Sequence, residues 1–332
     1  MESRYRFNIA GTGAYLPRRV VTAAELAAKC RLSECDLVRR FGIVQRHWAE
    51  GGDETSSAMG AAAAQAALAD AGWEAGSLDV IVGACGVMEQ PIPGTSVLIQ
   101  RRLGLGCSGV PAFDVNATCL SFLMAFDRVL AGFALGEWRR ALVVSADIAS
   151  AALDFSDPEA SVLFGDGAVA VALEAGGSHD RLALALRTYG EAADACRLEA
   201  GGTRLRPHGD LDGFLARSRF DMDGPAVFRA TSRRFPAFLA DLLDRAQIEA
   251  ADIDQVIPHQ ASAAALEHLK RSLPDGHART VDVYATVGNQ IATSMPFALH
   301  VARREGRLRA GGVGLLIGTS AGISLGGAVI RW

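Results

Sequence analysis

The residue in this chain best suited to covalent chemistry is Cys119, within the largely apolar stretch of residues 114–126. The pattern predicts a short strand over residues 112–116 that leads into an amphipathic helix with Cys119 in its first turn. Backbone N–H groups at a helix start are unpaired and carry partial positive charge, so a thiol there should have a lowered pKa and a favoured, nucleophilic thiolate. The alternative is a small buried hydrophobic residue. Cys119 is therefore a candidate nucleophile.

Two later stretches supply the partners that an activated thiol needs. Residues 256–261 are typical of a strand that ends at His259, followed by a helix over residues 262–273. A loop from residue 284 carries Asn289 and enters another helix. Taken singly, such a histidine can be structural and a Gly-Asn pair can be a turn. Together the three residues give the thiol, imidazole and amide of activated-thiol chemistry.

The elements that must position these residues alternate between strand and helix in both halves of the chain. Expected strands cover residues 7–13, 79–86, 140–147, 168–173, 182–187, 313–318 and 326–331. Expected helices begin after Thr22 and Ser33 and cover residues 55–71, 96–103 and, as one long helix, 225–247. This alternation predicts an α/β fold with a mixed sheet covered on both faces.

The second half of the chain repeats the plan of the first, which suggests an internal duplication. We assign the nucleophile half to residues 1–175 and the half with the histidine and asparagine to residues 176–332. Residues 189–223 break the pattern and are rich in Gly, Arg and Asp, so we expect a surface excursion near the entrance to the site.

Composition excludes several functional classes. The chain has 332 residues and a net charge of -4, which gives no electrostatic reason to bind nucleic acid or a membrane surface. No apolar run reaches the roughly 20 residues that a membrane-spanning helix needs, so we expect a cytoplasmic protein. The six cysteines form no C-x-x-C pair, which favours reduced thiols over disulfides or a zinc site.

Several ordered motifs give the chain a resemblance that runs almost end to end. They are IAGTGAYLP at 9–17, FGIVQRH at 41–47, FGDGA at 164–168, PHQA at 258–261, GN at 288–289 and GGAVIRW at 326–332. With these motifs the chain resembles the β-ketoacyl-ACP synthase III family of condensing enzymes. The resemblance implies a thiolase-like five-layered αβαβα sandwich built from two similar halves, a homodimer and no cofactor or metal.

The resemblance also implies a two-step reaction. An acyl thioester would load onto Cys119, and a malonyl thioester carried by an acyl carrier protein would then lose CO2 and attack the acyl group. His259 Nε2 and the Asn289 amide would hold the enolate oxygen. The family's second oxyanion hole would use the backbone N–H groups of Cys119 and Ala321.

This sequence departs from the family pattern at several places. Ala321 stands where the family usually has glycine. Asp36 and Ala151 stand where a Trp and an Arg usually hold the adenine of coenzyme A, which favours an acyl-ACP donor or a coenzyme A that is held differently. Ala264 replaces an arginine used for carrier docking. Other basic residues remain on two helices, either as a carrier-docking patch or as ordinary solvated helix faces: Arg229, Arg233, Arg234, Lys270 and Arg271.

The loop of residues 88–94 suggests a changed acyl pocket. In the family this loop crosses the dimer interface, and an aromatic residue closes the partner's pocket. Here Met88 and Ile92 are the pocket candidates, and Ile92 leaves room for a longer or branched acyl chain. Glu89 lies about three residues from the aligned position at which long-chain relatives supply a carboxylate base. Together the departures favour a divergent member in specialised metabolism.

Three alternatives stay open. The first keeps Cys119 but moves the acyl group, without decarboxylation, to an oxygen, nitrogen or other carbon acceptor; Asn289 favours condensation over this. The second is a Cys-His-Asn hydrolase, although Cys119 lacks the sequence setting of papain-like enzymes. The third, a degenerate partner subunit, is disfavoured because all three candidate residues are present.

Overall fold

The computed structural model describes residues 5–332, in which nine strands form one hydrogen-bonded sheet. In order across the sheet they are β11 (Gln255–Pro258), β12 (Val313–Ser320), β13 (Ser324–Arg331), β8 (His179–Thr188), β1 (Arg6–Tyr15), β7 (Gly167–Ala175), β6 (Arg140–Asp147), β4 (Val80–Gly83) and β5 (Ala112–Asp114). The predicted mixed α/β fold is therefore confirmed.

The sheet has matching halves on either side of its centre. β1 and β8 meet there through the pairs Arg6–Asp180 and Phe7–His179. Beyond β1 come β7, β6, β4 and an additional edge strand, β5, and beyond β8 come β13, β12 and β11. In both halves the outer pair, β4–β6 or β11–β12, is parallel and the inner pairs are antiparallel. The expected boundary between residues 175 and 176 falls at the end of β7, and we retain this division as a proposal.

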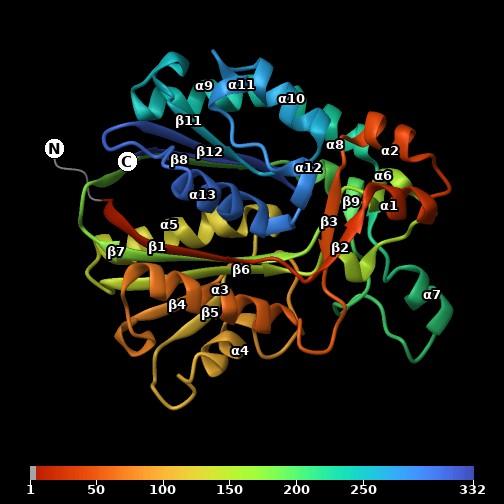
Figure 1. The fold of residues 1–332 in the computed structure, drawn as a ribbon, viewed down its shortest axis with the longest axis horizontal. Helices are drawn as coiled ribbons and strands as arrows, with labels where there is room; N and C mark the ends of the chain where they lie inside the picture. Colours follow the sequence, from red (N-terminus) through yellow and green to blue (C-terminus); the bar gives the residue numbers. More distant parts are fainter. Residues whose placement is uncertain (1–4) are drawn as a thin grey trace.

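Figure 1 shows the two halves of the sheet as separate layers with helices between and outside them. α5 (Ser121–Ala134) and α13 (Ser294–Arg304) lie in the middle and contact strands of both halves. α3 (Ser56–Ala71) and α4 (Thr95–Arg102) cover one outer face, and α9 (Phe235–Ala246), α10 (Ala263–Arg271) and α11 (Gly276–Arg279) cover the other. The expected five-layered αβαβα sandwich is confirmed.

The composition of the helices follows from their layers. α5 buries Phe122, Phe126 and Leu130 completely, because sheet strands pack on both of its sides. α3 is alanine-rich because it packs very closely on β1: a Cβ at Gly11 would lie 2.3 Å from the Ala67 carbonyl oxygen. Small residues are therefore required on both sides of this contact.

The expected long helix over residues 225–247 is wrong, because the structure has two helices there. α8 (Gly224–Ser232) ends two residues before α9 begins. The cause is Pro236, which lacks the N–H that would bond the Ser232 carbonyl and whose ring would collide with that carbonyl in a continuous helix. Pro236 instead occupies the first turn of α9, where its missing N–H costs nothing.

The remaining elements gather at the end of the molecule opposite the termini (Figure 1). The expected caps at Thr22 and Ser33 are confirmed, since their side chains accept hydrogen bonds from the N–H groups of Glu25 and Asp36. The strands and helices here are β2 (Arg19–Thr22), β3 (Gln45–Trp48), β9 (Cys196–Arg197), β10 (Asp221–Met222), α1 (Ala23–Lys29), α2 (Glu34–Phe41), α6 (Pro158–Ser161), α7 (Leu211–Ala216), α8 and α12 (Tyr284–Val287). Six 3₁₀ segments complete the fold: η1 (Ala75–Ser77), η2 (Thr118–Leu120), η3 (Ala149–Ala152), η4 (Gly190–Ala195), η5 (Ala250–Asp252) and η6 (Ile291–Thr293).

Candidate functional site

Cys119 lies in η2, a single turn between β5 and α5, and so just before the helix rather than within its first α-helical turn. The preceding residue, Thr118, has a left-handed φ of 52°, which is unusual for a β-branched residue. The side-chain oxygen of Asn116 accepts a hydrogen bond from the Thr118 N–H at 2.9 Å. The Ser121 hydroxyl accepts from the Ala117 N–H at 2.9 Å and donates to the Thr118 carbonyl at 2.7 Å. Side chains on both sides of Cys119 thus hold its backbone.

The environment of the thiol contradicts the expected pKa. Burial raises the pKa of Cys119 above its ordinary value, and Cys196 and Asp147 act in the same direction. The Ala321 N–H, which hydrogen-bonds the sulfur, lowers the pKa without reversing the effect. Cys119 packs against an apolar cluster that desolvates the thiolate, and a single 3₁₀ turn offers fewer N–H groups than a full helix start. The resting group is therefore the neutral thiol.

His259 follows β11 and is almost completely buried, with 5% of its surface exposed. Its backbone N–H donates to the Ile317 carbonyl at 2.9 Å, which continues the pairing of β11 with β12. Burial lowers the pKa of His259 to about 4, so the imidazole is neutral at physiological pH. Its Nδ1 has no hydrogen-bond partner within residues 5–332.

Asn289 lies in the turn that leads through η6 into α13, and 7% of its surface is exposed. Its backbone pairs with the loop before β7: the Asn289 N–H donates to the Leu163 carbonyl at 2.9 Å, and its carbonyl accepts from the Gly165 N–H at 3.1 Å. Its side-chain oxygen accepts from the Ile291 N–H at 2.9 Å, and Nδ2 donates to the Ala261 carbonyl at 3.3 Å. The amide is thus directed to the loop that follows His259.

The end of β12 lies between the Cys119 turn and His259. Gly318 is wedged between His259 and Leu120, so that a Cβ there would lie 2.7 Å from His259 Cβ. The Ser320 hydroxyl donates to the Ala117 carbonyl at 2.8 Å, and the Ala321 N–H reaches the Cys119 sulfur. Gly322, with a φ of 134°, takes the unusual conformation of this turn, so the backbone at position 321 does not require glycine.

Sequence reasoning missed Asp147, a buried carboxylate at the end of β6 that ties the two halves together. Its Oδ1 accepts from the N–H groups of Gly86 and Val87 at 2.8 and 2.9 Å. Its Oδ2 accepts from the Thr293 N–H and hydroxyl at 3.1 and 3.0 Å. Burial raises its pKa to about 6. The only signal in the sequence was an acidic residue at the end of an otherwise apolar strand.

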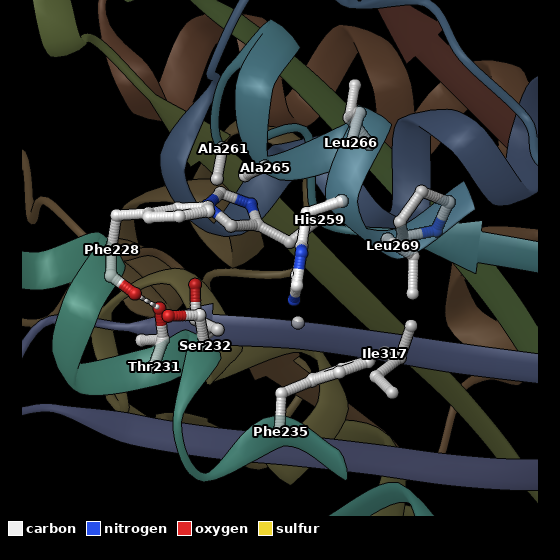
Figure 2. A pocket seen from close by; sticks show the side chains of 14 residues that line it. Phe228, Thr231, Ser232, Phe235, His259, Ala261, Ala265, Leu266, Leu269 and Ile317 are labelled. Carbon is white, nitrogen blue, oxygen red and sulfur yellow. Dashed lines mark hydrogen bonds between the residues drawn. The ribbon is translucent and has the colours of Figure 1, made fainter. Parts of the chain in front are cut away.

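A cavity of about 520 Å³, measured with its open mouth, reaches His259 from the surface between α8, α9 and α10. Figure 2 shows Phe228, Thr231 and Ser232 on one side of it and Ala261, Ala265 and Leu269 on the other. Its wall is mostly apolar, with polar groups at intervals. A narrow space of this kind suits a long flexible chain whose reactive end meets His259.

The predicted docking residues fall into two groups. Arg229 on α8 and Arg233, which directly follows α8, are exposed next to residues that line the cavity, and they form no ion pair within residues 5–332. Lys270 pairs with Asp282 at 2.6 Å and Arg271 with Glu267 at 2.7 Å. Arg234 pairs with Glu191. Among the predicted docking residues, those whose positive charge is not paired with an acidic residue therefore lie on α8 and directly after it.

The other predicted positions lie outside the lining of the cavity beside His259. Asp36 is engaged at the start of α2 by Ser33 and Arg39, and Ala151 is exposed. Ile92 is 86% exposed, and Met88 is half-buried in the same loop. Neither lines the cavity beside His259.

Glu89 has a structural partner. Its carboxylate accepts a hydrogen bond from the Ser57 N–H at the start of α3, at 2.6 Å. Carboxylates are stabilising in that position because of the unpaired N–H groups of the helix. This engagement favours a helix-capping role over the role of a catalytic base.

Three further properties of residues 5–332 concern membrane helices, cysteines and metal-binding groups. Within residues 5–332, no helix is long and apolar enough to cross a membrane. The six cysteines are free thiols in this structure. No group of histidine, cysteine and acidic side chains with the geometry of a metal site occurs in this part of the chain.

Comparison with known proteins identifies close relatives. Residues 113–190 match the family described as 3-oxoacyl-[acyl-carrier-protein (ACP)] synthase III, and residues 243–332 match its C-terminal region. The chain is 37% identical to the β-ketoacyl-[acyl-carrier-protein] synthase III of Rhodospirillum rubrum, over 98% of this chain and 99% of that protein. It is also 37% identical to an acetoacetyl CoA synthase of Streptomyces sp., over 98% and 99%. The crystal structure of 3-oxoacyl-(acyl carrier protein) synthase III from Pseudomonas aeruginosa PAO1 superposes with a TM-score of 0.86, at 34% identity and 98% coverage of both chains.

Proposed function

The chain belongs to the 3-oxoacyl-[acyl-carrier-protein] synthase III family, and we propose that it loads an acyl group onto Cys119 and condenses it with a malonyl thioester. The protein is an acyltransferase with the thiolase-like fold of that family. The observation that carries the residue assignment is the end of β12, which contacts both the Cys119 turn and His259.

In the first step, the Cys119 sulfur attacks the acyl thioester carbonyl. A new S–C bond forms, the old one breaks, and the carrier thiol leaves with the proton that Cys119 loses. The Ala321 N–H, which already reaches the sulfur, and the Cys119 N–H are the donors we assign to the developing oxyanion.

In the second step, a malonyl thioester loses CO2 and its enolate oxygen is held by His259 and Asn289. A buried imidazole N–H without an acceptor would be costly, and Nδ1 has none, so the proton of the neutral ring belongs on Nε2. Nε2–H is the donor that an enolate needs. The enolate carbon then attacks the acyl-Cys119 carbonyl, the β-ketoacyl thioester leaves, and the Cys119 sulfur regains a proton from solvent.

The cavity beside His259 is the place we assign to the arm of the thioester substrate. An acidic carrier protein would dock over the cavity mouth through Arg229 and Arg233, whose charges are free. Changing both to glutamate should raise KM for malonyl-ACP about tenfold, in keeping with the loss of favourable charge contacts. KM for a malonyl thioester without the carrier should not change. Arg271→Glu, at a residue already paired with Glu267, is the matched control.

The deciding experiment is intact-mass spectrometry with a panel of acyl-ACPs and acyl-CoAs, on the wild-type protein and on Cys119→Ala. We expect an acyl adduct on the wild type alone, which malonyl-ACP then discharges with release of CO2. An adduct that also forms in Cys119→Ala, or none from any thioester, would overturn the assignment of Cys119. An adduct that amine or alcohol acceptors discharge without CO2 release would favour the non-decarboxylative alternative, and cleavage of peptides would favour the hydrolase.

A second candidate acceptor is malonyl-CoA, because a relative at 37% identity is named an acetoacetyl CoA synthase. The same assay compares malonyl-CoA with malonyl-ACP at equal concentration. Asp36 and Ala151 offer no aromatic or cationic surface for an adenine, which favours ACP for both substrates.

The cytoplasmic location, the homodimer and the role of Ile92 and Met88 in a partner's acyl pocket stay predictions. In favour of the dimer, Ile92 is a large apolar side chain with 86% of its surface exposed on a loop close to β4. Such exposure is typical of a residue that a second subunit covers. The absence of a cofactor also stays a prediction, as does a role in specialised metabolism.

A further inference from the structure

The turn that carries Cys119 and the turn that carries Asn289 are built from the same hydrogen bonds. In each, an asparagine oxygen accepts from the N–H two residues later, at 2.9 Å: Asn116 from Thr118 and Asn289 from Ile291. In each, a serine hydroxyl accepts from the N–H four residues earlier, also at 2.9 Å: Ser121 from Ala117 and Ser294 from Gln290. Each turn then becomes a 3₁₀ segment and a central helix.

Both turns also contain a strained residue at the same place. Thr118 has a φ of 52° and Ile291 a φ of 53°. A β-branched residue in the left-handed region costs on the order of 1–3 kcal/mol and persists only where its surroundings impose it. The asparagine oxygen imposes it here, because it bonds directly to the N–H of the strained residue.

We infer that Asn116 is a positioning residue for the nucleophile, an inference that rests on the proposed function of Cys119. By holding Thr118 in the left-handed conformation, Asn116 sets the direction in which the next residue, Cys119, presents its sulfur to the Ala321 N–H. Asn116 is exposed, and its Nδ2 makes only a long contact of 3.5 Å with the Gly86 carbonyl. Its side chain therefore contributes little to the core, and its main effect is on the turn.

The test compares Asn116→Ala, which removes the acceptor, with Asn116→Asp, which keeps it. Asn8→Ala, at a half-buried asparagine of the central strand β1 and outside the Cys119 turn, is the control. The first readout is the rate of Cys119 acylation by excess acyl-ACP, followed by rapid quench and intact-mass spectrometry. The second is CO2 release from malonyl-ACP, which depends on His259 and Asn289 and not on the direction of the thiol. The melting temperature reports the fold.

We expect Asn116→Ala to slow acylation roughly ten- to hundredfold, since small misplacements of a reacting group have effects of this order. Its KM for the donor, its CO2 release and its melting temperature should stay close to those of Asn8→Ala. Asn116→Asp should recover part of the acylation rate at any pH between 6 and 8, because it keeps the acceptor while its negative charge disfavours the thiolate.

Two results would overturn the inference. One is acylation of Asn116→Ala at the wild-type rate. The other is an equal loss of acylation, CO2 release and melting temperature, which would make Asn116 a purely structural residue. If the wild-type protein forms no acyl adduct at all, it is the proposed function that fails, and the assay separates the two cases.

Discussion

The two halves of the molecule present the same backbone frame to the site but give it different chemistry. The turn of residues 116–121 and the turn of residues 289–294 share their hydrogen bonds, their strained residue and the helix that follows. The nucleophile Cys119 occupies the fourth position of the first turn, and the matching position of the second holds Ala292, which is completely buried. The asparagines match, but Asn116 is exposed whereas Asn289 is 7% exposed.

The strand ends behind these turns differ in the same way. Asn116 Nδ2 faces the carbonyl of Gly86, after β4, and Asn289 Nδ2 donates to the carbonyl of Ala261, after β11. In the first half, Ala84 lies two residues before Gly86. In the second half, His259 lies two residues before Ala261. The shared backbone frame alone therefore does not create the site, because the side chains that it carries differ between the two halves. In the proposed mechanism one half holds the acyl group and the other holds the enolate, because single residues differ on a shared backbone frame.

The largest effect should come from moving the thiol between the turns. Cys119→Ala should abolish the acyl adduct and lower condensation by at least about a thousandfold. Adding Ala292→Cys to that variant should not restore the adduct, because position 292 is completely buried. Intact-mass spectrometry measures both. Acylation of the double variant would show that either turn can present a reactive thiol, which would contradict the proposed difference between them.

The next largest effect should separate the two functions of Asn289. Asn289→Asp keeps the oxygen that holds Ile291 but replaces the amide donor by a charge, so CO2 release should fall about a hundred- to a thousandfold while acylation of Cys119 persists. Asn289→Ala loses both groups. If Asn289→Asp released CO2 at the wild-type rate, the amide would not be an enolate donor.

The two halves should also respond differently to pH. The pKa of His259 is lowered to about 4, so its ring stays neutral from pH 8 down to about pH 5 and CO2 release should change less than about twofold in that range. The pKa of the Cys119 thiol is raised, so the thiolate fraction, and with it the rate of acylation, should increase with pH throughout this range.

Rates of the two steps measured separately between pH 5 and 8 test this contrast. Asp147→Asn is an informative companion variant, because it removes the carboxylate that lies close to the thiol and should therefore shift the acylation profile to lower pH. A loss of CO2 release centred near the ordinary histidine pKa of about 6.5 would contradict the burial of His259.

The smallest effect concerns stability. Ser121→Ala leaves the half-buried N–H of Ala117 without its acceptor, and Ser294→Ala leaves the buried N–H of Gln290 without its acceptor, which should cost about 1–3 kcal/mol of unfolding free energy in each case. Ser121→Ala should cost more, because the Thr118 carbonyl also loses its donor. Urea denaturation of both variants provides the measurement. A loss in only one of them would show that the two turns are not held alike.

The sequence by itself determined the features that depend on local pattern. Apolar runs located the strands, Thr22 and Ser33 marked helix starts because their side chains reach nearby N–H groups, and the set of Cys119, His259 and Asn289 indicated the chemistry. Matching order in the two halves also indicated a duplication. These inferences need only residue types and short-range spacing.

The tertiary structure alone decided what depends on neighbours far apart in the chain. Apolar side chains from distant segments desolvate Cys119 and raise the pKa of its thiol, whereas its place at a helix start predicted a lowered pKa. Lys270 and Arg271, two of the predicted docking residues, form ion pairs with Asp282 and Glu267, so their charges are already paired. Asp147 accepts a hydrogen bond from Thr293, which lies 146 residues later in the chain. Burial and electrostatics follow from three-dimensional proximity, whereas sequence spacing reports only the neighbours along one element.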